Sequence, residues 1–212
     1  MKHIPVLLVL GLALSLCNLT DKLKGTKTGS GTGTTKSESS SIDPGVEAEP
    51  ATPSPAQAAA LAGGQTVKWD QQGMSWTVPP QWKQVSTDSK QLVWRSPGGS
   101  DAANLIVSIS TMDESFPAGI SIKAFYDQAK TRMKNGEVDE VKWLKIDGLT
   151  GYEFREANPE KPDDFRRLQW MAYRKYAGQL QLVNLMLSTN GAGFPKHQDE
   201  MYGIMYSSKI VH

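Results

Sequence analysis

The sequence predicts an α+β fold in which an antiparallel β-sheet lies between helices, preceded by a long unstructured segment. Every aromatic residue lies after residue 64, so the large side chains needed for a core are confined to residues 65–212. Within that region most segments alternate like strands, and two segments have helical spacing. The last strand-like segment, residues 179–188, is apolar on both faces, so both faces of the sheet should be covered.

The composition limits the classes of function. The net charge is +1 at pH 7, which gives no support for binding to nucleic acid, since such proteins usually present a strongly basic face. Cys17 is the single cysteine of the chain and lies outside the predicted domain. The domain therefore has no disulfide, no cysteine-based metal site and no cysteine nucleophile.

The first 17 residues have the features of an export signal. Lys2 provides a basic start, and residues 4–16 are apolar throughout. This run is shorter than the roughly 20 residues that span a bilayer, but it suits a signal peptide. Cys17 follows directly and resembles the modified cysteine of a bacterial lipobox, although Leu16 stands where a small residue is usual. We expect residues 1–17 to end at a lipid-carrying Cys17 that anchors the protein to a membrane without crossing it.

This anchor predicts export to the bacterial cell envelope, at the periplasmic or surface face of the outer membrane. Ordinary secretion and an uncleaved anchor are the alternatives. Residues 18–64 are rich in Gly, Ser, Thr and Pro, which predicts a disordered tether between the anchor and the domain. A string resembling a phosphate loop lies in this tether, but Thr35 precedes Lys36 where the motif requires Gly, so no nucleotide site is expected.

The first half of the domain, residues 65–112, consists of strands. A hairpin is expected around Gly73, and the two prolines at 79–80 end it. The expected strands cover residues 66–69, 74–78, 82–85, 91–95 and 104–112.

A helix then begins at Ser121, which is predicted to be its N-cap, and ends at residues 135–136. Its apolar face is expected to contain Ile122, Phe125, Ala129 and Met133. Two pairs of strands follow, with turns at 147–148 and 177–178, over residues 138–146, 149–157, 165–176 and 179–188. A C-terminal helix is marked by Phe194, Met201, Ile204 and Met205.

Three segments of the domain carry a resemblance to a known family. Residues 73–82 (GMSWTVPPQW) resemble the opening of PsbP-like domains, residues 146–154 (IDGLTGYEF) resemble the entry to their central hairpin, and residues 207–210 (SSKI) resemble their end. The domain also resembles the related DcrB-type envelope lipoproteins. This resemblance implies a PsbP-like α/β/α fold and a non-enzymatic binding or assembly module, and it assigns no binding residue.

The residues that usually carry chemistry form no catalytic pattern. His197 is the single histidine inside the domain apart from the terminal His212, so one chain cannot supply a histidine-based triad or a three-histidine zinc site. Glu137, Asp139 and Glu140 lack the spacing of a calcium loop. No carboxylate pair is singled out for glycoside hydrolysis. We therefore expect a protein that is not an enzyme and has no metal or cofactor.

The function expected from these observations is a membrane-tethered interaction or assembly module of the bacterial cell envelope, with another envelope protein as a possible partner. The alternative is a small-ligand carrier or sensor with an aromatic-lined pocket, because six tryptophans are many for a domain of this size. A simpler interpretation is that these rings fill the core.

A charged segment near residues 155–167 is the candidate contact surface. Acidic and basic residues alternate there around Pro159 and Pro162, and two long strands present the loop. The predicted partner-binding residues are Arg155, Glu156, Arg166 and Arg167. The alternative is a solvated turn whose charges keep an exposed edge from aggregating.

Overall fold

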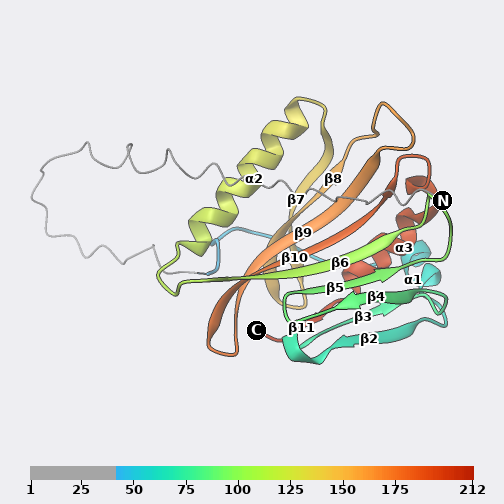
Figure 1. Cartoon of the computed structure of the whole chain (residues 1–212). Helices are drawn as coiled ribbons and strands as arrows, with labels where there is room; N and C mark the ends of the chain where they lie inside the picture. The colour runs from blue at the N-terminus through green and yellow to red at the C-terminus, as the bar shows by residue number, and fades with distance from the viewer. Residues whose placement is uncertain (1–41) are drawn as a thin grey trace, which may run out of the picture. The chain divides into compact units, whose positions relative to one another are not determined.

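The computed structural model describes residues 42–212 (Figure 1). The predicted signal segment, Cys17 and the tether up to residue 41 lie outside the described residues. The described part contains the helices α1 (Pro55–Ala60), α2 (Ala118–Lys134) and α3 (Phe194–Tyr206). None of these helices is long and apolar enough to cross a membrane.

The larger of two sheets in the described part has eight strands in the order β1-β7-β8-β9-β10-β6-β5-β4. All neighbours are antiparallel except β1, which runs parallel to β7. The strands are β1 (Glu49–Pro50), β4 (Lys83–Thr87), β5 (Gln91–Arg95), β6 (Asn104–Met112), β7 (Val138–Ile146), β8 (Leu149–Glu156), β9 (Phe165–Tyr176) and β10 (Gln179–Asn190). The smaller sheet contains β2 (Gln65–Trp69), β3 (Met74–Val78) and β11 (Lys209–Ile210), in the order β11-β3-β2.

Two neighbouring strand pairs are joined by tight turns that the sequence predicts correctly. Asp147 and Ala177 have φ angles of 48° and 50°, and each is followed by a glycine that also has positive φ. Two consecutive residues with positive φ match the two-residue turns that suit the twist of antiparallel strands. These turns join β7 to β8 and β9 to β10, so four long strands lie side by side in the middle of the sheet.

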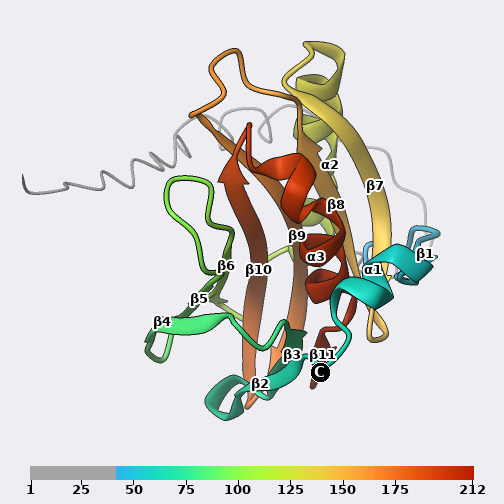
Figure 2. The same ribbon diagram turned by 90° about the vertical axis from the view of Figure 1, so that its right-hand side faces the viewer.

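Helices cover both faces of the larger sheet, as the apolar character of β10 predicts. On one face α2 packs through Ile122 and Ala129 against Tyr152 and Tyr173 of the sheet. On the other face Val107, Val183 and Leu185 join a larger core with α3 and the small sheet. Figure 2 shows α2 behind the sheet and α3 with α1 in front of it. The predicted α+β fold, with an antiparallel sheet between helices, is confirmed.

The prediction of a disordered tether over residues 18–64 is wrong for its last part. Residues 49–61, which we call the arm, form β1 and α1 and contact the domain. Ala51 donates its backbone N–H to the Lys145 carbonyl at 2.8 Å, and Leu61 packs against the larger core. Gly203 of α3 permits this contact, because a Cβ atom there would lie 2.7 Å from the Gln57 carbonyl oxygen. A linker-like composition gave no indication of this docking, since the contacts are with distant residues.

The start of α2 also differs from the prediction. Ser121 is not the N-cap: the helix begins at Ala118, and its N-cap is Pro117. The backbone N–H of Ser121 already donates to the Pro117 carbonyl at 2.9 Å, so Ser121 lies inside the first turn. Its side-chain oxygen lies 3.0 Å from the hydroxyl of Tyr173 and ties the helix to β9.

Candidate functional site

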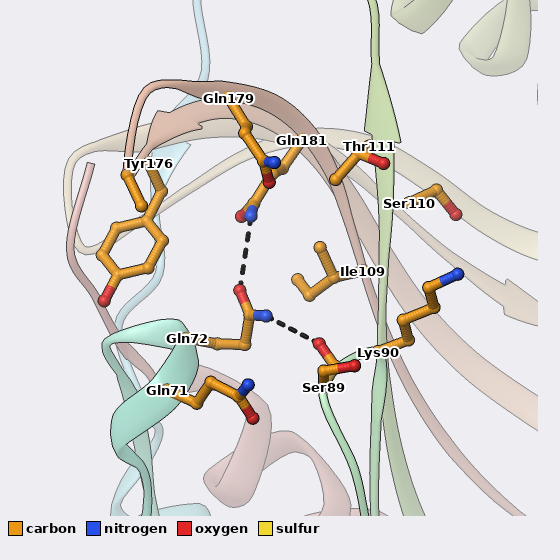
Figure 3. Close-up of a pocket in the computed structure, with 11 residues that line it drawn as sticks. Gln71, Gln72, Ser89, Lys90, Ile109, Ser110, Thr111, Tyr176, Gln179 and Gln181 are labelled. Carbon is orange, nitrogen blue, oxygen red and sulfur yellow. Dashed lines mark hydrogen bonds between the residues drawn. The ribbon is translucent and has the colours of Figure 1, made fainter.

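A polar cleft lies at one end of the domain, where the β9–β10 turn approaches the 3-10 helix η3 (Asp70–Gln72) and the ends of β5 and β6 (Figure 3). Its volume is about 610 Å³. The lining consists mainly of amide and hydroxyl side chains, with one lysine and one aromatic ring: Gln71, Gln72, Ser89, Lys90, Ile109, Ser110, Thr111, Tyr176, Ala177, Gln179 and Gln181.

Two local features hold the walls of the cleft. The Asp88 carboxylate accepts the backbone N–H groups of Lys90 and Gln91 at 2.7 and 2.8 Å, which fixes the turn that carries Ser89 and Lys90. These two backbone hydrogen bonds lower the pKa of Asp88. On the opposite wall, Gly73 ends η3 with a φ of 56°, and a Cβ atom there would lie 2.8 Å from the Tyr176 ring. Glycine is therefore required both for the backbone angle and for the close approach of the ring.

The inner wall of the cleft is a hydrogen-bonded layer of two glutamines. Gln72 donates through Nε2 to the Ser89 carbonyl at 2.7 Å, and Gln181 donates to Oε1 of Gln72 at 3.4 Å, as Figure 3 shows. Behind them lies Arg174, whose Nε donates to Oε1 of Gln181 at 3.0 Å and whose Nη2 donates to the Gln72 carbonyl at 2.8 Å. The orientation of both amides is thus set by the arginine.

Arg174 is a buried cation with neutral partners. Its residue surface is 1% exposed. Nη1 donates to the Val211 carbonyl at 2.9 Å, and the guanidinium lies 4.4 Å from the centre of the Tyr176 ring. None of the ion pairs found among the described residues includes Arg174. Burial lowers the pKa of Arg174 to about 10, so the group remains charged at neutral pH.

The lining of the cleft is suited to hydrogen-bonded recognition. It contains no His, Cys, Asp or Glu, and its titratable side chains are Lys90 and Tyr176. The side chains of Gln71 and Gln179 have no hydrogen-bond partner within residues 42–212, and both are exposed. Each amide offers two donors and an acceptor to a bound molecule. In the same residues no group of three His, Cys, Asp or Glu is arranged to hold a metal ion.

The tryptophans do not form the aromatic-lined pocket of the alternative hypothesis. None of them lines the polar cleft, whose one aromatic residue is Tyr176. Four are buried in the larger core, namely Trp69, Trp76, Trp82 and Trp170. Trp143 stacks on Tyr126 of α2 at 4.4 Å between ring centroids, and Trp94 packs against the larger core. This placement favours the simpler interpretation, in which the rings fill the space between sheet and helices.

The four predicted partner-binding residues lie together, but they bond within the domain. Asp139 accepts hydrogen bonds from Arg155 at 2.6 Å and from Arg166 at 2.7 Å. The carboxylate of Glu156 pairs with Arg132 at 3.2 Å and accepts three hydrogen bonds from Arg167, two from the guanidinium and one from the backbone N–H. These contacts join β7, β8, β9 and α2 away from the polar cleft.

Arg166 and Arg167, two of the predicted partner-binding residues, differ in burial. The Arg166 side chain is 7% exposed, and its guanidinium lies 4.0 Å from the centre of the Phe194 ring, so the expectation of an exposed Arg166 is wrong. The side chain packs on the buried Phe194 ring, and its guanidinium also donates to the Glu156 carbonyl and to Asp139. The Arg167 side chain is 41% exposed and keeps one side toward solvent. Binding of a partner by Arg155, Glu156, Arg166 and Arg167 stays a prediction.

His197 and a buried glutamate lie outside the polar cleft. The His197 Nδ1 atom is 2.8 Å from Glu200, which also accepts from Trp82 at 2.7 Å, consistent with a structural role on α3. Glu153 of β8 is 0% exposed. The Lys142 ammonium lies 3.1 Å from one of its carboxylate oxygens, and the Tyr206 side chain also interacts with the carboxylate. Burial raises the pKa of Glu153 to about 7.

Sequence reasoning missed the polar cleft. Gln181 stands in the run LQLV of β10, and Arg174 stands between Tyr173 and Lys175 in β9. An amide and a guanidinium on the core-facing side of two apolar strands are signals that the sequence did offer. Gln72 gave no such signal, because it reads as an ordinary turn residue beside Gly73.

Comparison with known proteins gives structural matches alone. No protein family profile and no curated protein matches the chain. Among solved structures, the chain is similar to cyanobacterial PsbP (CyanoP) from Synechocystis sp. PCC 6803, with 16% identity and a TM-score of 0.46, over 69% of this chain and 92% of that one. The expected resemblance to a PsbP-like domain thus appears among the structural matches.

Two further structures have a similar extent. LpqN of Mycobacterium tuberculosis, described as involved in cell envelope biogenesis, is 10% identical with a TM-score of 0.47, over 70% of this chain and 86% of that one. The Ran-binding protein Mog1p of Saccharomyces cerevisiae is 12% identical with a TM-score of 0.39, over 70% of this chain and 95% of that one. Similarity at this level concerns the fold and assigns no function.

Proposed function

We propose that this chain is a non-enzymatic binding module of the bacterial cell envelope, anchored by lipid on Cys17, which recognises a polar partner at the polar cleft. The observation that carries this proposal is the lining of the cleft. Amides and hydroxyl groups can hydrogen-bond a partner in several directions, while the lining lacks the acidic, imidazole and thiol groups that catalysis would use.

The anchor is supported by the sequence. Cys17 directly follows the apolar residues 4–16 and is the single cysteine of the chain. Lipid on this residue would hold the domain at a membrane surface. The arm then determines how close the domain lies to that surface, because its docking removes residues 49–61 from the free length of the tether.

Lipidation is tested by labelling cells with a palmitate analogue and isolating the protein. The wild type should be labelled and recovered with membranes, whereas Cys17→Ser should be unlabelled. Ser15→Ala serves as the matched control, since it changes the same segment and keeps the thiol. Equal labelling of the wild type and Cys17→Ser would exclude the lipid anchor.

The cleft is tested by photo-crosslinking in cells. A photoreactive residue replaces Gln179 in one strain and Lys123, which is exposed on α2, in a matched control strain. We expect a discrete protein adduct from position 179 and none from position 123. Equal adducts from both positions, or none from position 179 while the protein is folded and exported, would contradict recognition of a protein at the cleft.

A small-ligand carrier or sensor remains a second candidate function. The volume of about 610 Å³ lies in the range of sites for small molecules. Native mass spectrometry of the protein extracted from its own membranes would detect a retained ligand as a defined mass increase. The increase should disappear in a variant with Gln179→Trp, which would fill the mouth of the cleft.

A further inference from the structure

Arg174 lies directly behind the polar cleft and has no ion-pair partner within residues 42–212. The acceptors around its guanidinium are two backbone carbonyls and the side-chain oxygens of Gln72 and Gln181, all of them neutral. Removing a cation from water without an opposite charge is costly, and a hydrogen-bonded shell of neutral dipoles offsets that cost incompletely. An anion in front of the two glutamines would supply the missing charge.

The rim of the cleft carries Lys90, with the Asp88 carboxylate beside it on the same turn. Lys90 contributes a second cation at the rim, and its side chain is exposed. No lining residue is acidic. Asp88 and water both weaken the field of Lys90 at the exposed rim, whereas Arg174 is buried and is screened less. Because a recess with low-dielectric walls concentrates the field of the charges around it, Arg174 should attract an anion into this space.

The side chains of Gln72 and Gln181 lie between Arg174 and the cleft and can transmit this attraction. Arg174 holds the oxygen atoms of Gln72 and Gln181, so the amide nitrogens of both side chains are directed away from the guanidinium. These nitrogens donate at present to the Ser89 carbonyl and to Gln72. Amide donors polarised by a cation behind them are well suited to a carboxylate, which accepts several hydrogen bonds from N–H groups.

We propose that the polar cleft selects ligands that carry a carboxylate, with Arg174 as the residue that determines this specificity through Gln72 and Gln181. The inference rests on the proposed function, because it names the class of ligand for the same cleft. A single negative charge on a body rich in amides or hydroxyl groups fits the neutral polar side chains around it. The carboxylate could belong to a peptide C-terminus or to an acidic sugar.

The test compares matched anionic and neutral probes on the full chain in mild detergent. The probes are acetyl-Ala-Ala with a free carboxylate and the same peptide as its amide, and glucuronate and glucose. Binding is followed by NMR through the backbone amide signals of Lys90 and Gln179. We expect at least one carboxylate probe to bind about tenfold more tightly than its neutral counterpart, and added salt to weaken that preference. The peptide and sugar pairs distinguish the two sources of the carboxylate.

Variants separate this specificity from mere binding. Arg174→Gln should abolish the preference for the carboxylate probe, so that the anionic and neutral probes bind with equal affinity. Lys90→Gln, an exposed change that should not affect folding, should reduce the preference about threefold, and Lys123→Gln on α2 should not change it. If Arg174→Gln fails to fold, the Lys90 and salt results decide.

The outcomes separate the two proposals. Equal binding of neutral and anionic probes would overturn the carboxylate specificity and leave the cleft as a binding site. A preference that persists in folded Arg174→Gln would overturn the assigned role of that arginine. Absence of any signal change at Lys90 and Gln179 with all four probes at tens of millimolar would overturn the carboxylate specificity and count against small-molecule binding at the cleft.

Discussion

Replacing Glu153 by Gln should stabilise the domain at alkaline pH. The carboxyl group is 0% exposed, and burial raises its pKa from 4.5 to about 7. The folded state therefore favours the protonated form. The corresponding stability is fully present below pH 4.5 and is lost as the pH rises through about 7. At pH 8 the domain must hold Glu153 as a buried anion.

The size of the effect follows from the shift in pKa. Each unit corresponds to about 1.4 kcal/mol, so a rise from 4.5 to about 7 corresponds to about 3 kcal/mol of folding free energy between pH 4.5 and pH 8. Gln is a neutral group of nearly the same shape and resembles the protonated acid. Lys142 keeps an ionic partner in the variant, because its ammonium also lies 2.9 Å from Glu140.

The measurement is urea unfolding followed by tryptophan fluorescence at pH 4 and pH 8. The difference in free energy between Glu153→Gln and the wild type should be close to zero at pH 4 and about 3 kcal/mol in favour of the variant at pH 8. Glu160→Gln, a change at an exposed loop position, is the matched control and should show no such pH dependence. A variant that is equally or less stable than the wild type at pH 8 would refute the reasoning.

Three other predictions concern the parts of the domain that the sequence described incorrectly. Arg166→Ala should lower the free energy of unfolding by about 2 kcal/mol, because it removes a buried guanidinium that packs on Phe194 and donates to Asp139. Arg167→Ala should lower it by about 1 kcal/mol or less, and equal losses for the two variants in urea unfolding would contradict the burial difference. Gly203→Leu should release the arm, because a side chain there collides with Gln57, and hydrogen exchange over residues 55–60 should accelerate while β9 and β10 stay protected. A fragment of residues 42–212 should melt at a higher temperature than one of residues 65–212, because the latter lacks the arm; equal melting temperatures would show that the arm contributes nothing to stability.

Periodicity and turn chemistry in the sequence were sufficient for most of the fold. The alternating segments became strands, and the turns at residues 147–148 and 177–178 joined neighbouring strands, because both signals depend on residues close in the chain. The apolar character of both faces of β10 correctly indicated that helices cover the sheet on two sides. The aromatic residues, all of which follow residue 64, identified the region that contains the core.

Tertiary structure decided the features that depend on distant residues. The arm docks because Gly203, which is distant in the sequence, leaves room for α1. No local pattern in residues 49–61 predicts that contact. Arg166 is buried because it packs on Phe194 of α3, although its neighbours in the sequence are charged and loop-like. Ser121 lies within the first turn of α2 because Pro117 already accepts its N–H.

The polar cleft depends most strongly on residues that are distant in the sequence. Its walls come from η3, the start of β5, the end of β6 and the β9–β10 turn, which the sequence separates by up to about a hundred residues. The sequence by itself determined the strands, their turns and the single Cys17 at the end of an apolar N-terminus. The folded domain alone decided which polar residues meet, because a buried charge such as Arg174 acquires its surroundings only when β9, β10, η3 and Val211 pack together.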